Sequence, residues 1–205
     1  LDHILSRFAF LQNQFTGTPF KIHYAMKANA NPKILQALRE AGAGIDSVSI
    51  GEIELALQAG FAARDIIFSG VGKTKDEIRR AGHYRIKQIN IESLPELERI
   101  ISLSEQEGFK VDVGIRLNPE VNPVTHPYIT TGFRENKFGI DATVLPELLK
   151  LLSRPGCPVR LRGLSIHIGS QLLDLAAFQE ALQIARDQFL DLVKKGFEVD
   201  RLDVG

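Results

Sequence analysis

The hydrophobic positions along this chain change period repeatedly, from every second residue to every third or fourth. Residues 2–15 carry apolar side chains at helical spacing, whereas residues 20–26 alternate between apolar and polar side chains, as a half-buried strand does. The same exchange between a short strand pattern and a helical pattern continues along the sequence. We predict strands at 20–26, 43–48, 65–69, 87–91, 110–117, 159–168 and 200–204.

Helix-start signals separate these strands. A Ser/Thr-x-x-Glu sequence, which is the pattern of a capping box, occurs three times, beginning at Ser49, Thr74 and Ser93. Asn31 can cap another helix, because an Asn side chain accepts a hydrogen bond from the first turn, and Pro32 fits that turn. Residues 118–140 are predicted to be irregular. The predicted helices after the first are 32–41, 49–59, 74–81, 93–107, 145–152 and 175–192.

Alternation of strands and helices predicts a parallel sheet with crossover helices. A (β/α) barrel has eight strands in roughly 250 residues, and this chain has 205 residues. No Gly-x-Gly-x-x-Gly sequence follows the first strand, which argues against an open dinucleotide-binding sheet. We therefore predict an α/β fold: a (β/α)8 TIM-like barrel that is incomplete at its C-terminal end. Residues 1–205 would form one truncated barrel domain, with an eighth strand beyond Gly205.

Four polar residues lie on the polar side of strands whose other side is apolar. They are Lys27, Asp46, Arg116 and His167. In a barrel, one face of each strand points to the surrounding helices and the other to the lumen. Barrel enzymes keep their chemistry at the carboxyl ends of the strands. We therefore expect these four side chains to converge there.

Lys27 is the strongest candidate for chemistry. An amine at the end of a strand, just before a helix, is well placed to form a Schiff base with a carbonyl compound. Burial and a neighbouring Arg116 would both favour the neutral, nucleophilic amine. The alternative is a structural ion pair between Lys27 and a carboxylate such as Asp46. The position of Lys27 favours the functional interpretation.

The other candidates carry weaker signals. His167 could stack on an aromatic ring or move protons, or it could be an ordinary core histidine. Gly169 and Ser170 could bind a phosphate through backbone N–H groups and a hydroxyl. Capping already accounts for Glu52. We predict no metal, because metal-ligand spacing is missing among His3, His23 and His83.

Composition gives no support to several classes of function. The 25 basic and 25 acidic residues give a formal net charge of zero, which does not favour nucleic acid or a membrane surface as a partner. No apolar run is long enough to span a bilayer, and we recognise no signal peptide. The single cysteine, Cys157, cannot form an intramolecular disulfide and favours a reducing, cytoplasmic location. It lies in a Pro-Gly-Cys-Pro loop with no histidine beside it, so we expect no catalytic role. We expect both ends of the chain to be truncated.

Tyr24 to Asn29, read as Tyr-Ala-Met-Lys-Ala-Asn, resembles the cofactor-lysine motif of fold-type III pyridoxal-phosphate enzymes, which share the alanine-racemase-like barrel. Further motifs are similar to those of the diaminopimelate decarboxylase family and keep its order over nearly the whole chain. One segment departs from the family: residues 48–52 read Val-Ser-Ile-Gly-Glu where the family often has Val-Ser-Gly-Gly-Glu. The matching motifs are 68–74, 89–93, 116–119, 126–132, 137–139 and 167–171.

The resemblance implies a role for each candidate. Lys27 would carry pyridoxal 5'-phosphate as a Schiff base, and His167 would stack on its ring and act with Lys27 in catalysis. Ser170 would lie near the phosphate, and Gly205 would be the first glycine of a Gly-Gly-Gly phosphate loop. Asp46, Glu52 and Arg116 would surround the lysine and the ring phenolate. The implied cofactor-binding set is Lys27, Asp46, Glu52, Arg116, His167, Ser170 and Gly205.

The resemblance also implies an activity, decarboxylation of meso-diaminopimelate to L-lysine, by a homodimer with shared active sites. A C-terminal β domain, the acidic partner of the ring nitrogen and the arginine for the substrate carboxylate would lie outside this chain, so the isolated segment is expected to be inactive. Alternatives are an ornithine or arginine decarboxylase, an amino-acid racemase, a non-catalytic pyridoxal-phosphate-binding homologue, and an unrelated Schiff-base aldolase. The motifs at 70–74 and 126–132 favour diaminopimelate.

Overall fold

The computed structural model describes residues 1–121, 138–170 and 175–205. The chain divides into two compact units, Leu1–Ile89 and Asn90–Gly205, and each is described by itself. The strand order is β1-β2-β3-β4-β5-β6-β7, and the described pairings are parallel. The predicted alternation of parallel strands and helices is therefore confirmed.

The first unit contains the elements up to the start of β4. Its strands pair in chain order, with His23 opposite Gly44, Ile45 opposite Ile66, and Ile67 opposite Gln88. Two short 3-10 turns, η1 and η2, adjoin β1 and β3. The elements are α1 Asp2–Gln14, β1 His23–Ala25, η1 Met26–Ala28, α2 Pro32–Glu40, β2 Gly44–Ser47, α3 Ile50–Gln58, η2 Ala63–Asp65, β3 Ile66–Phe68, α4 Lys75–Tyr84 and β4 Gln88–Ile91.

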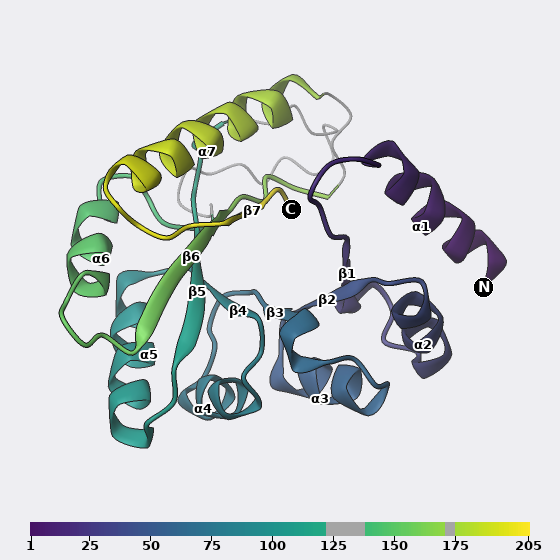
Figure 1. Ribbon diagram of the computed structural model, residues 1–205, viewed down its shortest axis with the longest axis horizontal. Helices are drawn as coiled ribbons and strands as arrows, with labels where there is room; N and C mark the ends of the chain where they lie inside the picture. The colour runs from purple at the N-terminus through teal and green to yellow at the C-terminus, as the bar shows by residue number, and fades with distance from the viewer. Residues whose placement is uncertain (122–137, 171–174) are drawn as a thin grey trace, which may run out of the picture. The chain divides into compact units, whose positions relative to one another are not determined.

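In the second unit, three helices flank the longest strands. Figure 1 shows α5, α6 and α7 along the sides of β5 and β6, and all three helices contact β6. Their apolar faces meet strand residues that are fully buried, and each such Leu, Ile or Val contributes about 1.5–3 kcal/mol. The elements are α5 Leu94–Glu107, β5 Val111–Arg116, α6 Leu145–Leu152, β6 Val159–Ser165, α7 Ala176–Lys194 and β7 Arg201–Asp203.

The helix-start signals are confirmed, with one difference. Thr74 forms a complete capping box, in which the Glu77 carboxylate returns to the Thr74 N–H. At α3 and α5 the cap serine accepts from the third residue of the helix, but the glutamate of that residue bonds one position further back. The Glu52 carboxylate accepts from the Val48 N–H at 2.7 Å. These two serine caps have φ near −155°, against −73° at Thr74, so a different N–H faces the carboxylate.

Six of the seven predicted strands run past the observed carboxyl ends, five of them by one residue and the strand predicted at 159–168 by three. The first ends at Ala25, because Met26 turns into the protein interior and starts η1. Lys27 therefore lies in a 3-10 turn and not on the strand. The sixth strand ends at Ser165 and not at residue 168, because the neighbouring strands on both sides end at the partners of Ser165, which are Arg116 and Asp203.

A β-bulge lies in the middle of β6. Val113 of β5 is opposite Leu161, but the next residue, Gly114, is opposite Gly163, so Arg162 is an extra residue. An extra residue changes which side chains share a face. Gly163 and Ser165 therefore lie on the same face as Gly114 and Arg116, as the apolar pattern predicted.

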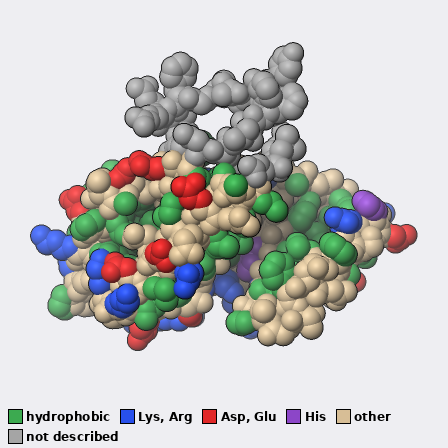
Figure 2. All heavy atoms as spheres, turned by 90° about the horizontal axis from the view of Figure 1, so that it is seen from above, with side chains coloured by type: hydrophobic (Ala, Val, Ile, Leu, Met, Phe, Trp, Pro, Cys, Tyr) green, Lys and Arg blue, Asp and Glu red, His purple; other side chains and the backbone are tan. Residues whose placement is uncertain are grey.

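Charges of both signs are interspersed on the face of the molecule seen in Figure 2. This agrees with the formal net charge of zero. Within the described residues, no helix is both long enough and apolar enough to cross a membrane.

We predict that Gly163→Ala destabilises the protein. A Cβ at Gly163 would lie 2.9 Å from the Arg201 Cβ and closer still to the Arg201 carbonyl oxygen, which is backbone that cannot move aside. Overpacking of this kind costs about 1–3 kcal/mol or more. The control is Gly51→Ala in α3, where the nearest atom to a Cβ is 3.9 Å away. Helix propensity makes that variant up to about 1 kcal/mol more stable. Urea midpoints that fell equally in both variants would contradict this account.

Candidate active site

Lys27 lies at the carboxyl end of β1, in a turn closed by its own neighbours. Its side chain is exposed. The Tyr24 hydroxyl donates to the Asn29 carbonyl oxygen at 3.1 Å, so one hydrogen bond spans the turn. Burial raises the pKa of Tyr24, and the phenol therefore stays protonated as a donor. The turn is thus held in place while the Lys27 amine points away from the core.

The alternative of a Lys27–Asp46 ion pair is not realised. Among the described residues Lys27 makes no ion pair, and the expected burial of its side chain is also wrong. Asp46 is the β2 partner of Ala25, two residues before Lys27. Its Oδ1 accepts from the Ser69 hydroxyl at 2.5 Å, which ties the ends of β2 and β3 together.

The loop between β2 and α3 is held by two carboxylates. Glu52 accepts from the Val48 N–H, and the Ile50 N–H donates to Glu77 Oε1 at 3.2 Å. Burial alone would raise the pKa of Glu77, but the N–H donors of Thr74 and Ile50 and the cation of Lys73 outweigh it and lower the pKa. The stability that Glu77 contributes is therefore present above the ordinary glutamate pKa and is lost as the pH falls through its lowered pKa. Glu52 serves the helix start, as capping predicted.

Arg116, at the carboxyl end of β5, is fixed by a buried carboxylate. Its Nη1 lies 2.9 Å from both oxygens of Glu92, and the two side chains are only 13% and 4% exposed. The guanidinium carbon also lies 5.5 Å from the centre of the Phe138 ring. Burying a carboxylate costs several kcal/mol unless it is paired, so Glu92 and Arg116 hold each other in one geometry.

The ends of β6 and β7 meet at Gly205. Its φ is +93°, and a Cβ there would lie 2.9 Å from both His167 Nδ1 and the Ile166 carbonyl oxygen. Only glycine fits this approach without strain. The Gly205 N–H donates to Asp203 Oδ1 at 3.0 Å, and Asn90 Nδ2 donates to Asp203 Oδ2 at 3.3 Å. His167 and Ser170 are exposed beside this turn.

Three residues of the second unit had no predicted role: Asn90, Glu92 and Asp203. They hold Arg116 and Gly205 in position. Asn90 and Glu92 alternate with the apolar residues of β4, which is the pattern that singled out Arg116. A search for polar residues that alternate with apolar ones around β4 would therefore have found both Asn90 and Glu92.

Several predictions are not tested by the described residues. The motif at 126–132 lies outside them, as do Lys137 and Gln171. The convergence of Lys27 and Asp46 with Arg116 and His167 concerns both units and stays a prediction.

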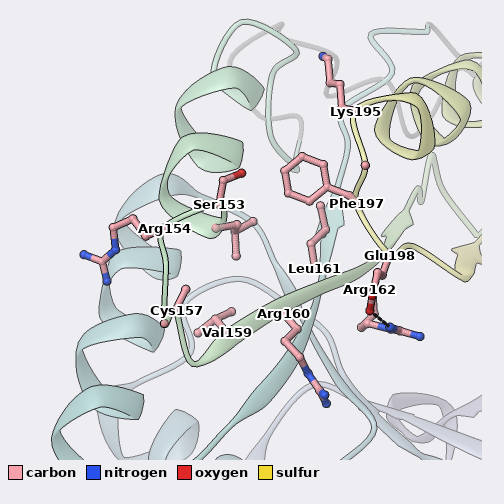
Figure 3. Close-up of a pocket in the computed structure, with 13 residues that line it drawn as sticks. Ser153, Arg154, Cys157, Val159, Arg160, Leu161, Arg162, Lys195, Phe197 and Glu198 are labelled. Atoms are coloured by element: carbon pink, nitrogen blue, oxygen red, sulfur yellow. Dashed lines mark hydrogen bonds and ion pairs between the residues drawn. The ribbon is translucent and has the colours of Figure 1, made fainter.

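A cavity of about 350 Å³ lies at the opposite end of β6 from His167 (Figure 3). Its lining includes Cys157, and no candidate residue is among the described residues that line it. Each Lys or Arg in this lining is already paired with a carboxylate, so the cavity is not the candidate site. The pairs are Arg154–Glu105, Arg160–Asp112, Arg162–Asp200 and Lys195–Asp191. Among the described residues, no three His, Cys, Asp or Glu side chains are grouped as metal ligands.

Comparison with known families covers the whole chain. The family described as pyridoxal-dependent decarboxylase, pyridoxal binding domain, matches residues 1–205. The chain belongs to this family. Pyridoxal phosphate is therefore the cofactor of the domain, and the resemblance found in the sequence is confirmed.

The relatives compared here are both named diaminopimelate decarboxylase. The chain is 41% identical to the diaminopimelate decarboxylase of Campylobacter jejuni over 204 residues, which is 100% of this chain and 50% of that protein. It is 43% identical to that of Vibrio cholerae over 188 residues, 91% of this chain and 45% of that protein. The chain thus spans about half the length of the curated relatives it matches.

A solved structure supports the same family and fold. Diaminopimelate decarboxylase from Helicobacter pylori complexed with L-lysine matches with a TM-score of 0.90 and 39% identity, over 98% of this chain and 51% of that one. The predicted fold class, α/β with seven parallel strands of an incomplete barrel, is therefore confirmed.

The residues present fit this cofactor. Lys27 offers an exposed primary amine, and His167 offers an exposed flat ring. At Gly205 the space that a Cβ would fill is taken by the His167 ring, so a backbone N–H and an imidazole adjoin at one place. Backbone N–H groups in glycine turns bind phosphate, and an imidazole can lie against an aromatic ring.

We predict that Glu92→Ala destabilises the second unit by about 3–5 kcal/mol, because it leaves the buried Arg116 cation without its carboxylate. The control is Glu105→Ala, which breaks an ion pair whose side chains are about half exposed, 50% for Glu105 and 48% for Arg154. An exposed pair contributes at most about 1 kcal/mol. Denaturant titration measures both, and similar losses in the two variants would refute the buried-pair argument.

Proposed function

We propose that residues 1–205 are the pyridoxal-phosphate-binding barrel domain of an enzyme that decarboxylates meso-diaminopimelate to L-lysine. The observation that carries the proposal is Lys27: an exposed, unpaired amine directly after β1, among the described residues of a chain that matches a pyridoxal binding domain throughout. An eighth strand and a C-terminal β domain, outside this chain, would complete the enzyme.

The choice of substrate is supported by the relatives. Those compared above are named diaminopimelate decarboxylases, and the Helicobacter pylori structure holds L-lysine, the product proposed here. A lysine/ornithine decarboxylase from Vibrio vulnificus shares the fold at 24% identity and a TM-score of 0.79, and at that identity it supports the fold alone. Diaminopimelate is therefore favoured over ornithine and arginine.

Bound pyridoxal phosphate supplies an electrophilic carbonyl carbon and a ring that takes up the electron pair left when carbon dioxide departs. Lys27 would hold the cofactor covalently through its ε-amine and release it when the substrate amine takes its place. The freed amine can then carry a proton. Asp46, held by Ser69, would provide a fixed negative charge to orient the ammonium form of Lys27.

The second unit would orient the cofactor. Arg116 is held by Glu92, so its guanidinium can stabilise an oxyanion without reorganising. The His167 imidazole would lie against the ring and fix its plane. The Gly205 N–H and the Ser170 hydroxyl would donate to the phosphate. Glu52 would contribute indirectly, by holding the loop after β2.

The proposal includes a homodimer with shared active sites and a cytoplasmic location. A free Cys157, the single cysteine of the chain, supports a reducing compartment. The resemblance to the family supports the dimer, and sedimentation of the full-length protein would test it.

We predict that Lys27→Ala abolishes covalent attachment of pyridoxal phosphate, because no other amine would occupy the end of β1. Borohydride reduction followed by peptide mass analysis measures the attachment. The matched control is Lys33→Ala, which removes an exposed lysine six residues further along, in α2. Attachment that survives in Lys27→Ala, or that is lost in Lys33→Ala, would refute the assignment.

We further predict that the full-length protein, given meso-diaminopimelate, ornithine, arginine and lysine separately, releases carbon dioxide from diaminopimelate at the highest kcat/KM and forms L-lysine. A preference for another amino acid would make it a different decarboxylase. Attachment of the cofactor without any product would make it a non-catalytic homologue.

A further inference from the structure

Ser165, the last residue of β6, has a buried hydroxyl that makes no hydrogen bond to any of the described residues. The residue is 4% exposed, and its Oγ has no hydrogen-bond partner among the described residues. A buried hydroxyl without a partner is costly and rare in proteins. The missing hydrogen bond is informative because Ser165 lies two residues before His167, a candidate site residue.

The sheet neighbours of Ser165 are both charged. Arg116 on β5 and Asp203 on β7 are its two Cα partners, so the three side chains lie in register on one face. Each neighbour is already engaged. Arg116 is bound to Glu92, and the two oxygens of Asp203 accept from Asn90 and from the Gly205 N–H. Neither neighbour makes a hydrogen bond to the Ser165 hydroxyl.

One of these competing bonds is one that the proposed function would break. The donor to Asp203 Oδ1 is the backbone N–H of Gly205, an exposed residue. If Gly205 begins the phosphate loop, its N–H turns from Asp203 to a phosphate oxygen when the cofactor binds. Asp203 Oδ1 would then lose its donor, next to a hydroxyl that lacks an acceptor.

We propose that Ser165 is a positioning residue for the cofactor phosphate, and this rests on the proposed function. When the phosphate takes the Gly205 N–H, the Ser165 hydroxyl donates to the freed Asp203 Oδ1. The bond from the Gly205 N–H to Asp203 breaks, and two bonds form, one from the Gly205 N–H to the phosphate and one from the Ser165 hydroxyl to Asp203. No proton is transferred. Asp203 keeps two donors throughout, so the carboxylate does not pull Gly205 back from the phosphate. Ser165 thus acts through Asp203 and need not touch the cofactor.

The exchange is specific for phosphate, and that property separates it from a structural role. In the full-length protein, Ser165→Ala should raise the Kd for pyridoxal phosphate about tenfold, the size of one hydrogen bond to a charged group. Its Kd for pyridoxal, which lacks the phosphate, should stay unchanged. The thermal midpoint of the cofactor-free protein should stay the same or rise, because the variant removes an unsatisfied group.

The matched control is Ser104→Ala. Ser104, in α5, is 1% exposed, and its Oγ is likewise without a partner among the residues described. It lies in a helix and is not a sheet partner of Arg116 or Asp203, so this variant should leave both Kd values unchanged. Ser165→Cys keeps nearly the same volume with a much weaker donor and should show the same phosphate-specific loss, which covers the case in which Ser165→Ala fails to fold.

A double variant tests the route through Asp203. In an Asp203→Ala background, adding Ser165→Ala should cause no further loss of pyridoxal phosphate affinity, since the acceptor is already gone. Additive losses would overturn the proposal, as would an equal loss of pyridoxal affinity or no loss of either. If the unmodified protein does not bind pyridoxal phosphate at Lys27, the proposed function itself fails, and this inference fails with it.

Discussion

The extra residue in β6 is the constraint on which the second half of the candidate site depends. Before Arg162, β6 is in register with β5 as Val111 to Val159 and Val113 to Leu161; after it, Arg116 is opposite Ser165. Side chains alternate between faces, so without the bulge Ser165 would share the face of Leu161 and not that of Arg116. Arg162 can occupy the bulge because its guanidinium pairs with Glu198 and Asp200 outside the strand ladder. A single residue therefore decides that Ser165 lies on the same face as Arg116.

Carboxylates position several of the other groups. Glu92 fixes the Arg116 cation, Asp203 fixes the Gly205 turn, and Glu52 and Glu77 fix the loop after β2. A carboxylate suits this task, because its two oxygens accept from two donors at once and charge-assisted hydrogen bonds are the stronger kind. Arg116 and Gly205, two of the residues assigned to the cofactor, are thus held by acids that need not touch it. Groups held in this way stabilise charge without reorganising, which is the main source of electrostatic catalysis.

Asp203 connects this layer to the proposed chemistry. Its two bonds reach from the end of β7 to Asn90 on β4 and to the backbone of Gly205. Asp203 Oδ1 loses a donor when a ligand takes the Gly205 N–H, and a carboxylate is stabilised by each charge-assisted hydrogen bond that it accepts. The Ser165 hydroxyl, which has no hydrogen-bond partner among the described residues, lies on the neighbouring strand and can supply the replacement. In this view the buried polar groups near the site are matched to its liganded form.

The sequence by itself determined the alternation of strands and helices, the helix caps and the position of Arg116 on the polar face of β5. Those features rest on local period and capping chemistry, which a sequence displays directly. It also identified the family, because the motifs occur in order along the chain. Only the tertiary structure decided that Lys27 lies in an exposed turn, that Glu92 pairs with Arg116, and that the Ser165 hydroxyl has no partner among the described residues. These facts depend on which residues of separate strands are in register, and a one-residue bulge changes that register without leaving a clear signal in the hydrophobic pattern.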